Sequence, residues 1–171
     1  MVSKVQITVE MVKELRSRTG AGVMDARKAL DDAGGDLKKA EEILAEKGLA
    51  SAARKAGRET SQGLVESYIH SGNRVGALVE LNCETDFVAR TQEFRTLARN
   101  LAMQVAAMSP AFVDREAVPP DAGEVTDEQL LLDQAYIRDP GKTVREVITE
   151  VIAKTGENIR VRRFSRFALG E

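Results

Sequence analysis

The chain has 171 residues, of which 43% are hydrophobic and 30% are charged, so it should fold as one medium-sized domain or two smaller ones. Its formal net charge of −2 excludes an overall electrostatic attraction to nucleic acid or to an anionic membrane. The single cysteine, Cys83, excludes an intramolecular disulfide, and no apolar run reaches the ~18 residues that span a bilayer. Because the opening residues also lack the long apolar core of a secretory signal, we expect a cytoplasmic protein.

Residues 1–50 predict three short helices, each bounded by local start and stop signals. The expected limits are Thr8 to Gly20, about Val23 to Ala33, and Asp36 to Gly48. Apolar residues recur at helical spacing within each of them, which indicates a small helical domain. A basic, weakly helical connector should follow at residues 51–62.

From Gly63 onward the hydrophobic pattern alternates, as in strands. "LVESYIH" and "RVGALVELNC" flank Ser71-Gly72-Asn73 and predict an antiparallel hairpin. A long amphipathic helix should begin at Thr91 and end before Pro110. It should cover the sheet.

A proline-containing loop is expected at residues 111–123, within an acidic stretch that continues to Asp139. Two capping boxes follow this loop. Thr126 with Gln129 and Thr143 with Glu146 should each open a helix. The last strand, "NIRVRRFSRF", should return to the sheet with a bulge or a sheet edge near Arg163. We therefore expect an α+β fold: a helical domain, then an antiparallel-sheet core covered by helices at residues 63–171.

Catalytic motifs are weak. "YIRDPGKT" ends like a phosphate-binding loop, but Tyr136 replaces its first glycine and the segment follows an expected helix, whereas the motif needs a strand. His70 and Cys83 have no metal-ligand spacing around them, so structural roles are favoured. We expect no enzyme, no metal site and no cofactor.

Two surface candidates remain. The C-terminal arginines Arg160, Arg162, Arg163 and Arg166 alternate with phenylalanines and could bind phosphates and stack bases, although an edge strand with solvated arginines is favoured. The corner "TDFV", Thr85 to Val88, leaves the hairpin abruptly. From the residues alone, a cap at Thr85 or Asp86 with Phe87 buried is the favoured interpretation.

Four segments follow one another along the chain: "VKELRSRTGAGVMDARKAL" from Val12, "GGDLKKAEEILAEKG" from Gly34, "VESYIHSGNRVGALVELNCETDFV" from Val65 and "VIAKTGENIRVRRF" from Val151. In this order they resemble the elongation factor Ts family, the guanine-nucleotide exchange factors of bacterial translation. Together they cover most of the chain, and the Thr-Gly-Ala-Gly and Thr-Asp-Phe-Val pieces are specific.

The resemblance implies a partner, elongation factor Tu, and two contact surfaces. The N-terminal domain would be similar to ubiquitin-associated domains and would dock through residues around Lys13, Arg16, Val23 and Met24. The corner Thr85, Asp86, Phe87 and Val88 would insert beside the partner's Mg²⁺ and phosphate region, with Phe87 as a wedge between partner helices and Asp86 hydrogen-bonding shifted groups. The protein would act on the partner's Mg²⁺ and GDP and would need no cofactor of its own.

Longer members of the family carry two related core subdomains, whereas a single hairpin-and-helix core fits between Gly63 and Glu171. A single core offers less surface to a partner, so the resemblance implies a homodimer that binds two partner molecules. No direct contact with nucleic acid or membrane is expected. The alternative is an RNA- or ribosome-binding protein, whose affinity would depend strongly on salt and on Arg162 and Arg163.

Overall fold

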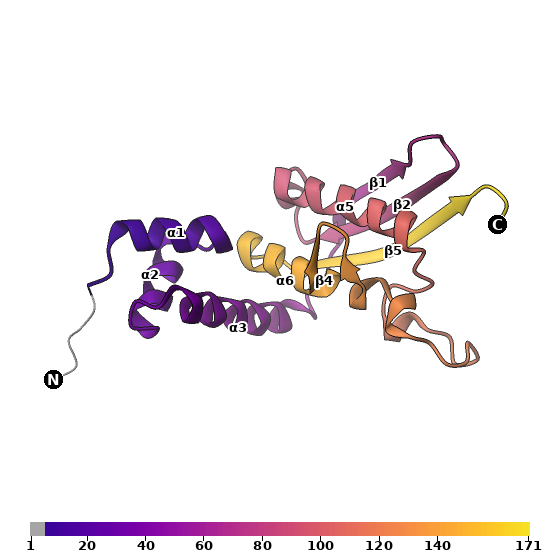
Figure 1. Cartoon of the computed structure of the whole chain (residues 1–171). Coiled ribbons are helices and arrows are strands. Elements are labelled where there is room, and N and C mark those ends of the chain that lie inside the picture. The colour runs from indigo at the N-terminus through magenta and orange to yellow at the C-terminus, as the bar shows by residue number, and fades with distance from the viewer. Residues whose placement is uncertain (1–5) are drawn as a thin grey trace.

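A computed structural model describes residues 6–171 and contains a helical part and a sheet-containing part (Figure 1). The helical part consists of α1 (Val9–Thr19), α2 (Val23–Asp32) and α3 (Leu37–Lys55). The Thr8 hydroxyl accepts a hydrogen bond from the Met11 amide and so caps α1, and Gly20 ends that helix with a φ of 69°. The signals expected at both ends of α1 are therefore confirmed. The buried apolar residues of this part are Val12, Leu15, Ala26, Ala29, Leu30 and Ala40.

The third helix is longer than predicted. It passes through Gly48 and ends at Lys55, so residues 51–55 are helical. Gly48 is buried against α6 (Val144–Thr155), where a Cβ added to it would lie 3.5 Å from the Ala153 Cβ. Packing between the two helices and the alanine-rich continuation of α3 outweigh the weak stop signal of one glycine.

The second part is built on a three-stranded antiparallel sheet, which confirms the α+β class. Its strands are β1 (Gln62–Ile69), β2 (Val75–Cys83) and β5 (Ile159–Ala168), in the order β1-β2-β5. The hairpin turn uses Gly72 and Asn73, both with positive φ. Glu80 pairs with Arg163 and Leu81 with Val161, so the predicted bulge lies at Arg162, on an edge strand.

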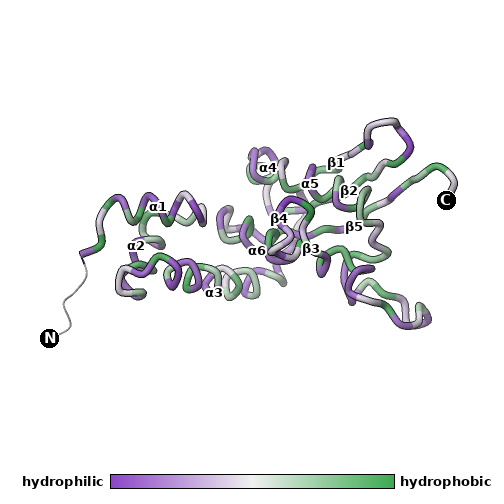
Figure 2. Tube along the Cα trace, viewed as in Figure 1, coloured by the Kyte–Doolittle hydropathy of each residue, from purple (hydrophilic) through white to green (hydrophobic). Residues whose placement is uncertain are grey.

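One face of the sheet is covered by helices. The long helix α5 (Gln92–Met108) packs on it with α6, and Thr91 and Thr143 cap them as predicted. Hydrophobic and hydrophilic residues both occur along the strands (Figure 2), and more buried and more exposed positions alternate because successive side chains point to opposite faces of the sheet. The central strand shows this clearly, since Val79 and Leu81 are fully buried while Leu78 is 46% exposed.

The acidic stretch differs from its prediction. Thr126 opens only the 3₁₀ turn η2 (Asp127–Gln129), between the similar turns η1 (Arg115–Ala117) and η3 (Leu131–Asp133). The chain turns inward there because Leu130 and Leu131 are fully buried. A small hairpin of β3 (Ala135–Tyr136) and β4 (Asp139–Thr143) follows, where the sequence predicted a helix and a loop.

The buried side chain of Gln104 fixes this stretch to α5. Its amide nitrogen donates to Gln134 Oε1 and to the Ala135 carbonyl, both at 3.0 Å, and its oxygen accepts from the Ile137 amide at 2.7 Å.

None of the helices in residues 6–171 combines the length and the hydrophobicity that crossing a membrane requires.

Candidate functional site

The corner after β2 forms a four-residue helix, α4 (Asp86–Ala89). Thr85 is its N-cap, in extended conformation, and its hydroxyl accepts a hydrogen bond from the Val88 amide at 3.4 Å. Val88 and Ala89 are 9% and 8% exposed and belong to the core. The predicted cap at Thr85 is confirmed.

Phe87 is 78% exposed, so the interpretation that it is buried is wrong. In so short a helix, Val88 and Ala89 face the core, and Phe87 is left on the solvent side. Asp86 is also accessible, and its carboxylate pairs with Arg90 at 2.8 Å. A large apolar side chain is thus exposed beside the Asp86–Arg90 ion pair.

Residues distant in the sequence hold this corner. The Glu157 carboxylate accepts hydrogen bonds from the backbone amides of Glu84 and Thr85 and from the Thr85 hydroxyl. The Cys83 thiol, within the core, donates to the Thr85 carbonyl at 3.1 Å. Burial, together with the nearby Glu157 charge, raises the pKa of that thiol to about 11. Sequence analysis missed Glu157, because no short-range pattern joins it to the corner.

Of the four N-terminal candidates, Lys13 and Arg16 lie in α1 and Val23 and Met24 open α2, and all four are exposed. Met24 is 76% and Val23 51% exposed, so two adjacent apolar side chains lie at the surface. Arg16 donates through Nε to the Ala21 carbonyl at 3.0 Å, and Lys13 lies one turn before it. Arg16 thus contacts the loop between α1 and α2, which leads directly to Val23 and Met24.

The helix α6 connects the two candidate surfaces. The Lys154 side chain, near its C-terminal end, contacts Gly20 at the end of α1. Glu157, which holds the corner, follows the same end of α6. The C-terminal end of α6 therefore lies close both to the end of α1 and to the corner.

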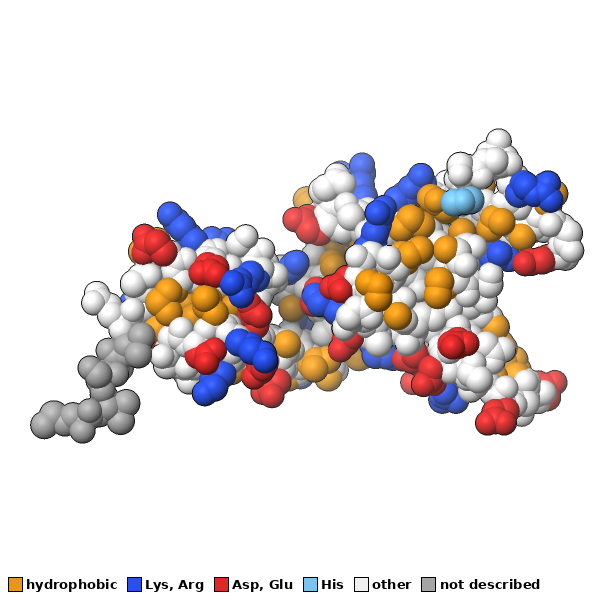
Figure 3. Space-filling model, viewed as in Figure 1, with side chains coloured by type: hydrophobic (Ala, Val, Ile, Leu, Met, Phe, Trp, Pro, Cys, Tyr) orange, Lys and Arg blue, Asp and Glu red, His pale blue; other side chains and the backbone are white. Residues whose placement is uncertain are grey.

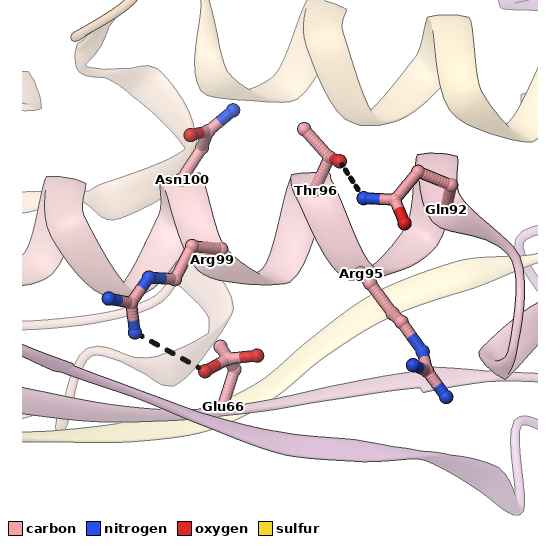
Figure 4. Close-up of a pocket in the computed structure, with 6 residues that line it drawn as sticks. All are labelled: Glu66, Gln92, Arg95, Thr96, Arg99 and Asn100. Atoms are coloured by element: carbon pink, nitrogen blue, oxygen red, sulfur yellow. Dashed lines mark hydrogen bonds and ion pairs between the residues drawn. The ribbon is translucent and has the colours of Figure 1, made fainter.

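A polar pocket of about 360 Å³ lies between β1 and α5 (Figure 4). It is lined by Glu66, Gln92, Arg95, Thr96, Arg99 and Asn100. The Arg99 guanidinium lies 3.5 Å from Glu66 and 5.2 Å from the centre of the Tyr68 ring, so its charge is already partnered. Among residues 6–171 no three His, Cys, Asp or Glu side chains cluster as metal ligands would.

Two of the four arginines on the last strand are engaged within the molecule. Arg163 pairs with Glu80 at 2.7 Å and lowers the pKa of that carboxyl, and Arg166 pairs with Glu171. Acidic and basic side chains are interspersed over the face seen in Figure 3. The pairing of Arg163 and Arg166 weakens the RNA-binding alternative, which needs a continuous basic surface.

The sequence "GKT" ends β4, where a turn before the helix was expected, and Thr143 caps α6 as predicted. Lys142, which would contact phosphates in a phosphate-binding loop, pairs with Glu150 at 2.6 Å. This contact raises the pKa of Lys142 and keeps its charge occupied. The local structure is that of a capped helix start.

Comparison with known proteins assigns the family. Residues 37–129 match the family model described as Elongation factor TS. Elongation factor Ts of Carboxydothermus hydrogenoformans is 50% identical over 96% of this chain and 90% of its own length. Those of Caldanaerobacter subterraneus and Anaeromyxobacter dehalogenans are 49% and 48% identical, over 96% and 97% of this chain and 98% and 90% of their own lengths.

The match extends over both parts of the molecule, including the helical part and the sheet core with its exposed corner. The protein is thus a translation elongation factor. Within that class, the chain belongs to the elongation factor Ts family.

Proposed function

We propose that this protein is a guanine-nucleotide exchange factor that binds elongation factor Tu carrying GDP in the cytoplasm and promotes release of the GDP. The single observation that carries the proposal is the display of Phe87, which is 78% exposed on a turn whose flanking residues are fixed. A rigid aromatic ring suits a wedge, because it brings a large apolar area with few rotatable bonds. The protein acts on its partner's nucleotide site and is not an enzyme.

Two contacts divide the work in this proposal. Lys13, Arg16, Val23 and Met24 dock the helical part on the partner's nucleotide-binding domain. Phe87 then enters between partner helices near the Mg²⁺ and phosphates, while Asp86 bonds the displaced groups. Mg²⁺ and phosphate contacts have strict geometry, so a small helix displacement weakens several of them together.

Linkage explains why the protein needs no nucleotide site of its own. If its binding weakens GDP binding by some factor, GDP must weaken its binding by the same factor. Each tenfold weakening of affinity corresponds to about 1.4 kcal/mol of binding free energy. The coupling is carried by contacts between the two proteins, so this chain requires neither a bound metal nor a cofactor.

The test is release of fluorescent GDP from elongation factor Tu after mixing with this protein. We expect wild type to accelerate release. With Phe87→Ala the acceleration should be roughly tenfold or more smaller, as for loss of a central aromatic contact. Phe87→Leu should be intermediate, because it retains part of the apolar area. Met108→Ala, which truncates an exposed apolar side chain at the end of α5, is the matched control and should behave as wild type.

Folding of each variant is checked by circular dichroism, and binding to the partner is measured separately. Absence of acceleration by folded wild type at micromolar concentration would refute the exchange proposal. Equal losses in Phe87→Ala and Met108→Ala would refute the specific role of Phe87.

We also propose that two copies associate through the outer face of the sheet. This face carries the exposed residues Val65, Ile69, Leu78 and Phe167 on three adjacent strands. Ile69 and Phe167 both pair with Gly76, so no side chain separates them on the central strand. A second copy would present the same apolar set across a twofold axis and cover it, as in other isologous dimers.

A further inference from the structure

We propose that Glu157 is a positioning residue for Phe87, acting through the N-cap Thr85; its effect on exchange rests on the function proposed above. Phe87 has little packing of its own, so its position is set by the backbone of α4. A helix of four residues is too short to be stable in isolation. Contacts from elsewhere in the molecule must therefore hold it.

Glu157 supplies three of these contacts through one carboxylate. Its Oε2 accepts from the Glu84 amide at 3.1 Å and from the Thr85 amide at 3.0 Å, and its Oε1 accepts from the Thr85 hydroxyl at 2.6 Å. Hydrogen bonds to an ionised acceptor are shorter and stronger than neutral ones. The same Thr85 hydroxyl accepts from the Val88 amide, so Glu157 orients the group that caps α4.

The Glu84 carboxylate, in the loop after β2, accepts a hydrogen bond in return from the loop before β5. Glu84 accepts from the Asn158 amide at 2.6 Å and lies 3.4 Å from an Arg58 nitrogen. The Asn158 side chain, 2% exposed, donates to the carbonyls of Ala56 and Arg58 just beyond α3. The loop after β2, the loop before β5 and the end of α3 are thus joined at one point.

This arrangement predicts that removing the Glu157 carboxylate loosens the corner and leaves the sheet intact. Alanine removes all three acceptor contacts. Glutamine keeps one acceptor oxygen for the two amides but turns an NH₂ group toward the Thr85 hydroxyl, so it should loosen the corner less. The matched control is Glu150→Ala, which removes an α6 carboxylate that pairs with Lys142.

The first measurement uses the free protein and needs no partner. The chain has no tryptophan, so Phe87→Trp places a single tryptophan reporter on the corner. We expect time-resolved anisotropy to show greater local mobility of this reporter when Glu157→Ala is added, less with Glu157→Gln, and none with Glu150→Ala. Amide exchange followed by NMR should show lost protection at Thr85 in Glu157→Ala, with protection in β2 retained.

The second measurement is GDP release from elongation factor Tu with Phe87 in place. We expect Glu157→Ala to lower the maximum release rate roughly tenfold, as loss of bonds to a charged acceptor would, and Glu157→Gln to recover part of it. A purely stabilising role would lower the melting temperature without changing the saturated rate. Comparing the change in the saturated release rate with the change in melting temperature therefore tests whether Glu157 positions Phe87.

An unchanged mobility of the tryptophan reporter and unchanged Thr85 protection in folded Glu157→Ala would overturn the proposal. So would a loosened corner with an unchanged saturated release rate. If Glu157→Ala does not fold, Glu157→Gln decides the same questions. If wild type itself does not accelerate GDP release from elongation factor Tu, the proposed function is refuted. Greater mobility of the reporter in the free variant would still support the role of Glu157 in holding the corner.

Discussion

Cys83 illustrates how one side chain serves both the core and the corner. It is fully buried in the central strand, and its thiol donates to the Thr85 carbonyl at the start of α4. A thiolate there would lose its hydration and would lie close to the Glu157 charge. Both effects favour the protonated thiol, and it is this form that makes the hydrogen bond.

We predict that stability falls as pH rises from about 9 to about 11, because of Cys83. Burial raises the pKa of the folded thiol to about 11, above its unfolded value, so the folded state keeps the proton while the unfolded state loses it. This contribution is fully present below pH ~8.5, the ordinary thiol pKa, and disappears above the folded pKa. Urea unfolding at pH 8 and pH 10.5 measures the change.

The control is Cys83→Ala, whose stability should be lower at pH 8 but should fall less over the same pH range. Parallel loss in both proteins would show that other groups cause the pH dependence. The folded thiol should also react with a disulfide reagent on the order of a hundredfold more slowly than the thiol in urea, from its lower thiolate fraction alone.

The site residues were predictable to different extents. The cap at Thr85 follows from local hydrogen bonding, which is why the sequence indicates it. The exposure of Phe87 depends on which neighbours enter the core, and residue-level reasoning placed it inside. Only the family resemblance indicated a displayed ring. Glu157 lies more than seventy residues from Thr85, and nothing local marks it.

At the scale of elements, α3 shows where local signals lose to packing. Its start at Asp36 was predicted because the capping hydrogen bond to the Lys39 amide is local. Its end was not, because the contact of Gly48 with α6 involves residues about a hundred positions away. The β3–β4 hairpin was missed for a similar reason, since Gln104 on α5 supplies its hydrogen bonds.

We predict that Gly48→Ala stabilises the protein by roughly 0.5–1 kcal/mol. The position is inside a helix, and the new Cβ would meet Ala153 at 3.5 Å, an ordinary van der Waals distance. Alanine also loses less backbone entropy on folding than glycine. Urea unfolding and the melting temperature measure the gain.

Gly63→Ala is the contrasting variant. Gly63 has a φ of 147°, and a Cβ there would collide with the Leu81 carbonyl oxygen on the paired strand. We expect a loss of stability at this site. Destabilisation by Gly48→Ala would mean that α3 and α6 pack more tightly than the structure shows.

At the scale of the whole molecule, the two faces of the sheet differ sharply. The inner face is covered by α5 and α6 and supplies much of the core, whereas the outer face leaves Val65, Ile69, Leu78 and Phe167 exposed. Exposed apolar side chains on three adjacent strands form a larger patch than scattered surface residues do. A second copy covering this face is the basis of the proposed homodimer.

We predict that Leu78→Arg halves the mass of the protein in solution. Leu78 is on the central strand between Ser67 and Ser165, so an arginine there would place a charge in the middle of the proposed interface. Light scattering coupled to size-exclusion chromatography measures the mass. Leu49→Arg, at a similarly exposed leucine on α3, should leave it unchanged. A wild-type monomer at micromolar concentration would contradict the prediction.

The strand order β1-β2-β5 also determines when each strand can pair during synthesis of the chain. The central strand pairs at once with β1, its neighbour in the hairpin, but its other edge must wait for β5, because residues 84–158 come between them. At ~5–20 residues per second the ribosome needs roughly 4 to 15 s for that interval. During it, β2 has one unpaired edge, so a nascent chain is most exposed to mispairing with other chains after the hairpin emerges and before β5 does.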